Sequence, residues 1–236
     1  MKVLAIDSSA KSSSVAIIED EKILSEFYLN NGLTHSHTLA PMIKNILDNT
    51  NLSLNEIDAF AVSNGPGSFT GIRIGISIVQ GMAMVLNKPC VPVSTLYSMA
   101  FNNLDTDYII CASMDARRNQ VYNALFETNG NLITRLTPDR AISIDELSLE
   151  LKNLGKKVIF VGDGADLCYN NMKNILLESK LAPENTKYQK ASSVAFAAFN
   201  LFKEQGFTMV EDLKPTYLRL SQAERELKNK NNGGIL

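Results

Sequence analysis

The sequence contains few of the residues that build disulfide frameworks and metal sites. It has three cysteines and two histidines in 236 residues, and no tryptophan. The cysteines, Cys90, Cys111 and Cys168, lie far apart, and no two of them have the spacing of a metal-binding pair. An odd and scattered set argues against a disulfide framework and favours reduced thiols in the cytosol.

The sequence also lacks an excess of charge of either sign. The chain has 23 Lys and Arg against 25 Asp and Glu, a formal net charge of −2. A protein that grips nucleic acid by itself usually carries a basic excess or a basic stripe. The balance therefore disfavours a free-standing nucleic-acid-binding module, although folding can still assemble a local basic patch.

Long uninterrupted apolar runs are absent as well. The apolar stretch near the N-terminus, 3–6, is too short for a signal sequence or a membrane span, because Asp7 ends it. The longest apolar segment, 72–86, is interrupted by Arg73, Gly75, Ser77, Gln80 and Gly81. We expect a buried helix there, no membrane association, and a cytoplasmic protein.

Apolar runs separated by turn residues predict a mixed α/β fold. In the first part of the chain, three short runs separated by turn residues are typical of antiparallel strands, and the later segments alternate between helix and strand. The predicted strands are 3–7, 14–19, 22–29 and 59–63, and the predicted helices are 36–49 and 70–86. A strand containing Pro92 is expected at a sheet edge or at a strand start, because proline lacks a backbone donor.

The same order of elements begins again near residue 105. Strands are predicted at 108–114, 120–127 and 157–161, and helices at 144–154 and 193–204. Two units of this kind indicate two related domains, which we place at 1–104 and 105–236, with a frayed tail over about 229–236.

The segment "SNGPGSFTGIRIG", 63–75, places four glycines between an apolar strand and an apolar helix. Glycines there are typical either of a loop that approaches phosphate or of a tight turn into a closely packed helix. No lysine follows in the position that a phosphate-binding loop requires, and Arg73 is the nearby cation. The pattern favours the structural turn.

Several motifs occur together in one order: "AIDSSAKSSSVAI", "THSHTLAPMI", "SNGPGSFTGIRIGISIVQGMA", "VPVSTLYSMA", "MDARRNQVYNALF", "VGDGA" and "PTYLRL…AE". Over nearly the whole chain this set resembles the TsaB (YeaZ) family of bacterial tRNA threonylcarbamoyladenosine biosynthesis. The resemblance implies two related domains of the actin-like ATPase, or ribonuclease H-like, type, each a mixed sheet flanked by helices. Members of this superfamily include ATPases and sugar kinases.

The resemblance also implies a function. TsaB-like proteins act as non-catalytic accessory subunits in threonylcarbamoylation of the tRNA adenosine 3′ of the anticodon, by binding the catalytic paralogue TsaD. The implied partners are a TsaD-like paralogue, a TsaE-like ATPase, a second copy of the chain in isolation, and tRNA indirectly through the complex. The alternative is a free-standing ATP-dependent small-molecule kinase or ATPase, motivated by Asp7 and the glycine loops at 65–71 and 162–164.

Five residues match positions that bind nucleotide in the superfamily. They are Asp7, Ser8 and Ser9 in the first loop, with Gly162 and Gly164 in "VGDGAD". Ordinary turns explain both segments equally well, and the accessory role favours a vestigial or structural use. We expect no cofactor on this chain alone, and ATP or ADP only at the interface of a complex.

Metal-ligating and nucleophilic patterns are missing. TsaD-like paralogues carry an HxxxH metal motif, and Thr95 and Met99 stand at about those positions here. His35 and His37 have no nearby carboxylate or thiol to complete a metal shell, and we expect them at the start of a helix. There is no G-x-S-x-G segment. We therefore expect no catalytic residues, no metal site and no enzyme activity.

The helix predicted over 70–86 is apolar on more than one face. One apolar stripe is expected to pack in the core of the domain itself. The second stripe predicts a subunit interface, which the resemblance also implies. The residues expected at this interface are Gly71, Ile74, Gly75, Ile78 and Met82. For the charged segment "MDARRN", with Asp115, Arg117 and Arg118, a solvated hairpin turn and a ligand or tRNA contact remain open alternatives.

Overall fold

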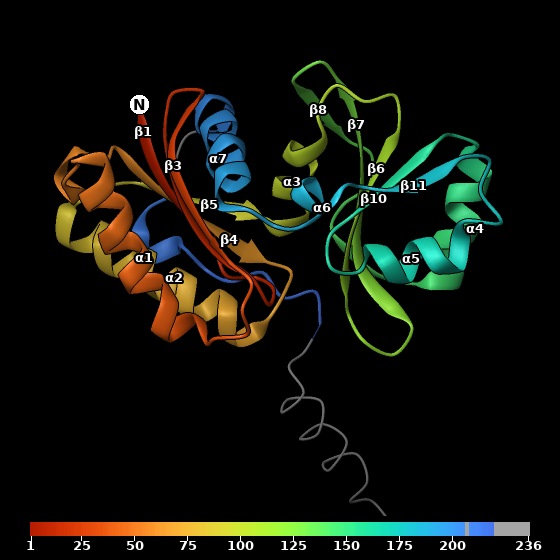
Figure 1. The fold of residues 1–236 in the computed structure, drawn as a ribbon, viewed down its shortest axis with the longest axis horizontal. Helices are drawn as coiled ribbons and strands as arrows, with labels where there is room; N and C mark the ends of the chain where they lie inside the picture. The colour runs from red at the N-terminus through yellow and green to blue at the C-terminus, as the bar shows by residue number, and fades with distance from the viewer. Residues whose placement is uncertain (206–207, 220–236) are drawn as a thin grey trace, which may run out of the picture.

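A computed structural model describes residues 1–205 and 208–219, which form two α/β lobes side by side (Figure 1). The tail expected to fray, 229–236, lies outside the described residues. Each lobe is built on its own sheet, which confirms the predicted fold class of two α/β units, whereas the boundary at 104/105 stays a prediction.

The first lobe is built on a five-stranded mixed sheet in the order β3-β2-β1-β4-β5. Its strands are β1 (Lys2–Asp7), β2 (Ser13–Glu19), β3 (Lys22–Leu29), β4 (Ala59–Gly65) and β5 (Cys90–Ser94). The first three strands pair antiparallel, as the turn residues between them predict, whereas β4 and β5 join parallel to β1 and to each other. Strand β5, with Pro92, lies at the edge.

Helices cover both faces of this sheet (Figure 1). Alternate residues of a strand point to opposite faces, and β1 uses both. Leu4 and Ile6 belong to the core beneath α1 (His35–Thr50) and α2 (Phe69–Leu86), whereas Val3 and Ala5 pack with α7 (Ala191–Gln205) on the other side. The sheet is therefore buried on both faces, which explains why β1 reads as a continuous apolar run.

The second lobe has a six-stranded sheet in the order β11-β10-β6-β7-β8, with β9 also paired to β7. Its strands are β6 (Ile109–Asp115), β7 (Gln120–Asn129), β8 (Leu132–Arg135), β9 (Arg140–Ser143), β10 (Val158–Val161) and β11 (Ser179–Leu181). Parallel pairing joins β6, β10 and β11, and antiparallel pairing joins the rest.

Helices also lie on both faces of the second sheet. Helix α4 (Ile144–Leu154) begins at a capping box formed by Ser143 and Glu146, and it packs with α5 (Ala165–Met172) on one face. Helix α3 (Thr95–Ala100) buries Leu96 and Met99 on the other face, next to α7. The short helix α6 (Glu184–Lys187) and three 3₁₀ turns, Leu54–Glu56, Phe101–Asn103 and Val210–Asp212, complete the described part.

The end of the chain returns to the first lobe. Helix α7 packs against β1 and β2, and Val210 and Leu213 join the core under α1 and α2. The expected second domain, 105–236, includes these segments, but their contacts place them with the first sheet. The reason is physical: Val194, Ala197 and Ala198 form an apolar helix face that covers the side of β1 and β2 that α1 and α2 leave open.

Helix α2 is long and apolar enough to cross a membrane by length and composition alone. Within the described residues, its Ile72, Ile76, Val79 and Ala83 pack into the core of the first lobe. One face of this helix is therefore taken up by the protein's own sheet, as in the core helix of an α/β lobe.

Candidate functional site: two loops and the outer face of α2

The loop after β1 is built around a buried carboxylate. Asp7 is 1% exposed, and its Oδ1 accepts hydrogen bonds from the backbone and hydroxyl of Ser9 at 3.0 and 2.9 Å. Its Oδ2 accepts one from the Ser63 hydroxyl at 2.5 Å. Burial raises the pKa of Asp7, and the bonds from Ser63 and Ser9 oppose that shift. This carboxylate ties β1 to β4, and its oxygens are engaged within the protein.

The glycines of the segment 63–75 let α2 approach this loop closely. A Cβ on Gly71 would lie 2.0 Å from the Ser8 carbonyl oxygen, and one on Gly75 would lie 2.5 Å from the Ser8 hydroxyl. A Cβ on Gly67 would meet the Ser9 carbonyl oxygen at 2.3 Å. The Ser8 hydroxyl also donates to the Gly71 carbonyl at 2.9 Å. The structural turn that the sequence favoured is therefore what the structure contains.

Gly71 and Gly75 were expected at a partner interface, and the structure places them inside the protein. Both are buried, and the backbone that approaches them belongs to Ser8 of the same chain. They do not belong to the outer face of α2.

Gly162 and Gly164, the glycines of the second loop, also let two backbone segments approach closely. Gly162 has φ +98°, and a Cβ there would lie 2.1 Å from the Ser113 carbonyl oxygen, while Gly164 packs on the backbone of Met114 and Asp115. The Gly164 amide donates to the same Ser113 carbonyl at 3.0 Å. These glycines join β10 to the end of β6, and their binding of nucleotide remains a prediction.

Between the two glycines, Asp163 lies on the loop that follows β10. Its side chain reaches solvent, yet burial by surrounding protein raises its pKa to about 6. Gln189 donates from Nε2 to the Asp163 carboxylate at 3.4 Å, and Asp115 adds like charge while Lys11 opposes it. The loop after β1 and the second lobe therefore face each other here.

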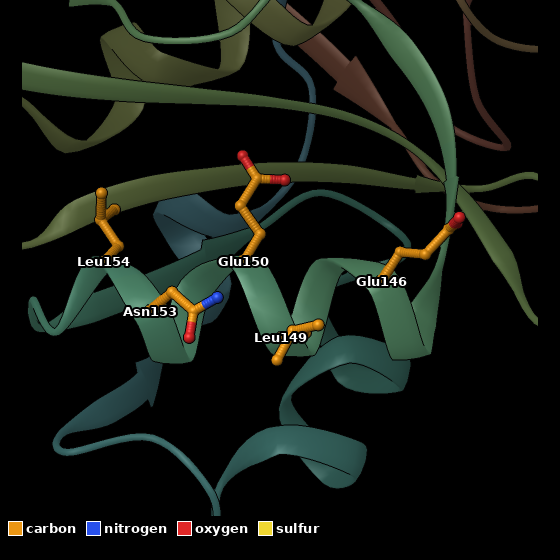
Figure 2. Close-up of a pocket in the computed structure, with 5 residues that line it drawn as sticks. All are labelled: Glu146, Leu149, Glu150, Asn153 and Leu154. Carbon is orange, nitrogen blue, oxygen red and sulfur yellow. The ribbon is translucent and has the colours of Figure 1, made fainter.

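Two surface hollows lie on the described part of the chain, away from these loops. One, of about 510 Å³, follows the outward side of α4, and Figure 2 shows that all five lining side chains come from that helix: Glu146, Leu149, Glu150, Asn153 and Leu154. The other, of about 280 Å³, lies between the end of α2 and residues 209–211. A hollow lined by one helix lacks the converging polar groups of a ligand site.

His35, Thr95 and Met99, which bear on the metal-site prediction, are each engaged in contacts within the protein. His35 begins α1 and donates from Nε2 to the Ala10 carbonyl at 2.8 Å, which joins the helix to the loop after β1. Thr95 and Met99 are both fully buried in α3. Among the described residues, no three Cys, His, Asp or Glu side chains are grouped as metal ligands.

The outer face of α2 is apolar and open to solvent. Met84 is 67% exposed and Val85 is 83% exposed. Ile74, Ile78 and Met82, three of the predicted interface residues, are half-buried and flank this face. A Cβ on Gly81 would meet nothing within 4 Å in the described part of the chain. We refer to Ile74, Ile78, Gly81, Met82, Met84 and Val85 as the outer face of α2.

A segment near the end of the chain connects the first turn of α2 to the second lobe. Tyr217 stacks on Phe69 with ring centroids 4.5 Å apart, and Arg73 donates from Nε to the Tyr217 hydroxyl at 2.7 Å. Two residues later, Arg219 donates from Nη1 to the carbonyl of Ala116 in the β6–β7 turn at 2.8 Å. In Figure 1 this blue segment leaves the first lobe toward the second. These contacts were not predicted, because they join residues about 100 or more apart in sequence.

Comparison with known proteins identifies relatives over the whole chain. The family model described as "TsaD: tRNA N6-adenosine threonylcarbamoyltransferase" matches residues 23–227. The TsaB protein of Escherichia coli is 32% identical over 98% of this chain and 100% of its own length. The TsaB protein of Bacillus subtilis is 29% identical over 95% and 96%, respectively. Both are described as tRNA threonylcarbamoyladenosine biosynthesis proteins.

A solved structure agrees with these relatives. A Pseudomonas aeruginosa protein described as similar to the peptidase YeaZ superposes with a TM-score of 0.79 over 92% of this chain and 99% of its own, at 24% identity. This likeness confirms the predicted fold class of two α/β units, each with a mixed sheet flanked by helices. Because the sequence relatives align end to end with this chain, the chain belongs to the TsaB family of tRNA threonylcarbamoyladenosine biosynthesis proteins.

Proposed function

We propose that the chain is a non-catalytic subunit that supports threonylcarbamoyl transfer to tRNA by binding a TsaD-like paralogue through the outer face of α2. Membership of the TsaB family supports a part in the biosynthesis. The observation that carries the proposal is the exposure of Met84 and Val85 on a helix whose other side is already buried. Apolar side chains gathered on one open face mark an interaction surface.

The shape of this face suits another helix. Ser77 and Gly81 are exposed, and the space above Gly81 is open in the described part of the chain, so a partner backbone can approach closely between the larger side chains. Close approach over small residues increases van der Waals contact along both helices. The same face is expected to pair two copies of the chain when the paralogue is absent.

The surroundings of Thr95 and Met99 support a role without catalysis. Both side chains are fully buried, so the positions at which a TsaD-like paralogue holds metal are filled by packing in this chain. Asp7, Ser8 and Ser9 are equally buried and engaged within the protein. We infer that the chain alone holds no nucleotide, that ATP or ADP binds at the boundary of the complex, and that a TsaE-like ATPase acts there.

Sedimentation velocity of the chain mixed with its TsaD-like paralogue tests the proposal. Val85→Glu should abolish the heavier species, because an unpaired charge buried in an apolar interface is costly. Leu149→Glu on α4, where Leu149 is 61% exposed, adds the same charge elsewhere and should leave assembly unchanged. Full assembly by Val85→Glu would contradict the choice of surface, and no assembly by the wild-type chain would contradict the proposed function.

The alternative function, a free-standing kinase or ATPase, has a separate test. Calorimetric titration of the isolated chain with ATP and Mg²⁺ should show no binding if the loop after β1 is structural. Tight binding followed by turnover would favour the enzyme.

A further inference from the structure

The arginines of the described residues divide into two groups by their contacts. Arg135 and Arg140 form ion pairs with Asp139 and Glu150 in the second lobe. The remaining four, Arg73, Arg117, Arg118 and Arg219, form no ion pair with any residue that the structure describes. A guanidinium without a carboxylate partner keeps its charge and donors available for another molecule.

These four arginines lie along one continuous path between the lobes. Arg73 contacts Tyr217 through its Nε, and Arg219 follows Tyr217 by two residues, a step of about 7 Å in extended chain. Arg219 then contacts the carbonyl of Ala116, which directly precedes Arg117 and Arg118. We call these four residues the arginine strip.

The turn that carries Arg117 and Arg118 is held in a costly conformation. Arg117, Arg118 and Asn119 have φ of +63°, +58° and +57°, three successive left-handed residues without glycine. Such a conformation costs about 1–2 kcal/mol for each residue other than glycine, and rather less for asparagine. The Asp115 carboxylate accepts from the Arg117 amide at 2.7 Å, and Ile144 donates to the Asn119 carbonyl at 3.2 Å.

Both arginines of the turn are exposed, so burial of their side chains does not offset the free-energy cost of this conformation. Asparagine or glycine at the same positions would relieve it. Two exposed arginines in a braced and strained turn are therefore better explained by a use for their charge than by stability.

The surroundings of the strip favour a nucleic-acid backbone over an acidic protein segment. Tyr217 is 37% exposed beside Arg73, and Arg219 lies over the ring of Tyr122 at 5.9 Å. Tyr217 also stacks on Phe69, so these rings hold the guanidinium groups in place along the extended segment. Arginines spaced along such a line are typical of surfaces that follow a phosphate chain. An acidic peptide would use the charges alone.

We propose that the arginine strip contacts the phosphate backbone of the tRNA on which the complex acts. This inference rests on the proposed function and extends it, because the sequence implied tRNA as a partner through the complex and left a tRNA contact of Arg117 and Arg118 as an open alternative. The net charge of −2 does not contradict it, because the strip places four arginines along one line, against the carboxylates of Asp115 in the same turn and of nearby Asp163.

The decisive variant replaces Arg117 and Arg118 together by asparagine. Asparagine tolerates the left-handed conformation, so Arg117→Asn/Arg118→Asn should fold with an unchanged or higher Tm. Two phosphate contacts are removed, so tRNA affinity should fall at least about tenfold and the slope of log K against log salt should decrease by about 2. A matched control, Lys22→Gln/Lys152→Gln, removes the same charge from exposed lysines elsewhere and should bind as wild type.

The measurement is fluorescence anisotropy of a labelled, unmodified tRNA transcript with the complex of full-length chain and TsaD-like paralogue, from 50 to about 300 mM salt. Loss of affinity and slope only in the arginine variant supports the strip. Equal binding by all three proteins overturns it, as does equal weakening by both variants, which would reflect net charge alone.

Two further controls separate this inference from the proposed function. Sedimentation shows whether the variant still assembles with the paralogue, so failure of the complex is distinguished from failure of RNA contact. Competition with polyglutamate that displaces the tRNA from wild type, but not from the arginine variant, would assign the strip to an acidic protein and overturn the RNA assignment.

Discussion

Truncating two side chains on the outer face of α2 should weaken the partner complex without weakening the fold. Val85 is 83% exposed and Met84 is 67% exposed. Full burial of a valine or methionine contributes about 2 kcal/mol, so burying what is exposed here supplies about 3 kcal/mol to an interface. Alanine retains part of that contact, and Met84→Ala/Val85→Ala should therefore raise Kd for the TsaD-like paralogue by about 30-fold, or about 2 kcal/mol.

The assay combines a Kd from calorimetric titration with the free energy of unfolding from urea. Unfolding should change by less than about 0.5 kcal/mol, because both side chains are exposed and alanine favours helix. Leu149→Ala/Leu177→Ala is the matched control, since these leucines of the second lobe are 61% and 82% exposed. The reasoning is refuted if the control weakens binding while the α2 variant binds as wild type.

Substitution of two glycines of α2 should change stability in opposite directions, and the carboxylate of Asp163 should make stability depend on pH. Gly71→Ala should lower the free energy of unfolding by about 1–3 kcal/mol, because its Cβ would lie 2.0 Å from the Ser8 carbonyl oxygen. Gly81→Ala should raise the free energy of unfolding by about 0.5–1 kcal/mol, because its Cβ would meet nothing within 4 Å in the described part of the chain. Urea denaturation measures both, and equal effects of the two variants would contradict the packing. The pKa of Asp163, raised by burial to about 6, means that the folded protein binds the proton more tightly than the unfolded chain, so stability falls as pH rises from about 4 to 6. Asp163→Asn, whose amide oxygen can still accept from Gln189, should stabilise the folded protein by about 1 kcal/mol at pH 8, after allowance for solvent screening, and should not stabilise it at pH 4. Thermal melts at pH 4 and pH 8 measure this difference, and equal effects at both pH values would contradict the raised pKa.

Local pattern predicted most elements of the fold. Helix α4 runs over the predicted 144–154 because its apolar residues recur at helical spacing and Ser143 with Glu146 caps it. Strands β1, β2 and β3 were predicted because turn residues separate their apolar runs. The short strands β9 and β11 were not, because three or four residues show too little periodicity, and both take their order from neighbouring strands.

Contacts distant in sequence limited the prediction of the site. The glycine spacing of Gly71 and Gly75 indicated close packing, but it did not reveal that Ser8, more than sixty residues earlier, is the neighbour. The return of α7 to the first sheet and the contact of Arg219 with Ala116 are likewise invisible in local pattern. The apolar second face of α2 was visible, because periodicity alone separates the two sides of a helix.

The most direct test of the central claim is a reconstituted transfer assay with this chain, its TsaD-like paralogue and a TsaE-like ATPase. A labelled threonylcarbamoyl donor and an unmodified tRNA with adenosine 3′ of the anticodon report the product. We expect no product from this chain alone, product when it is combined with the paralogue and the ATPase, and strong reduction when Val85→Glu replaces wild type. Robust transfer by the isolated chain, or full transfer without it, would contradict the account.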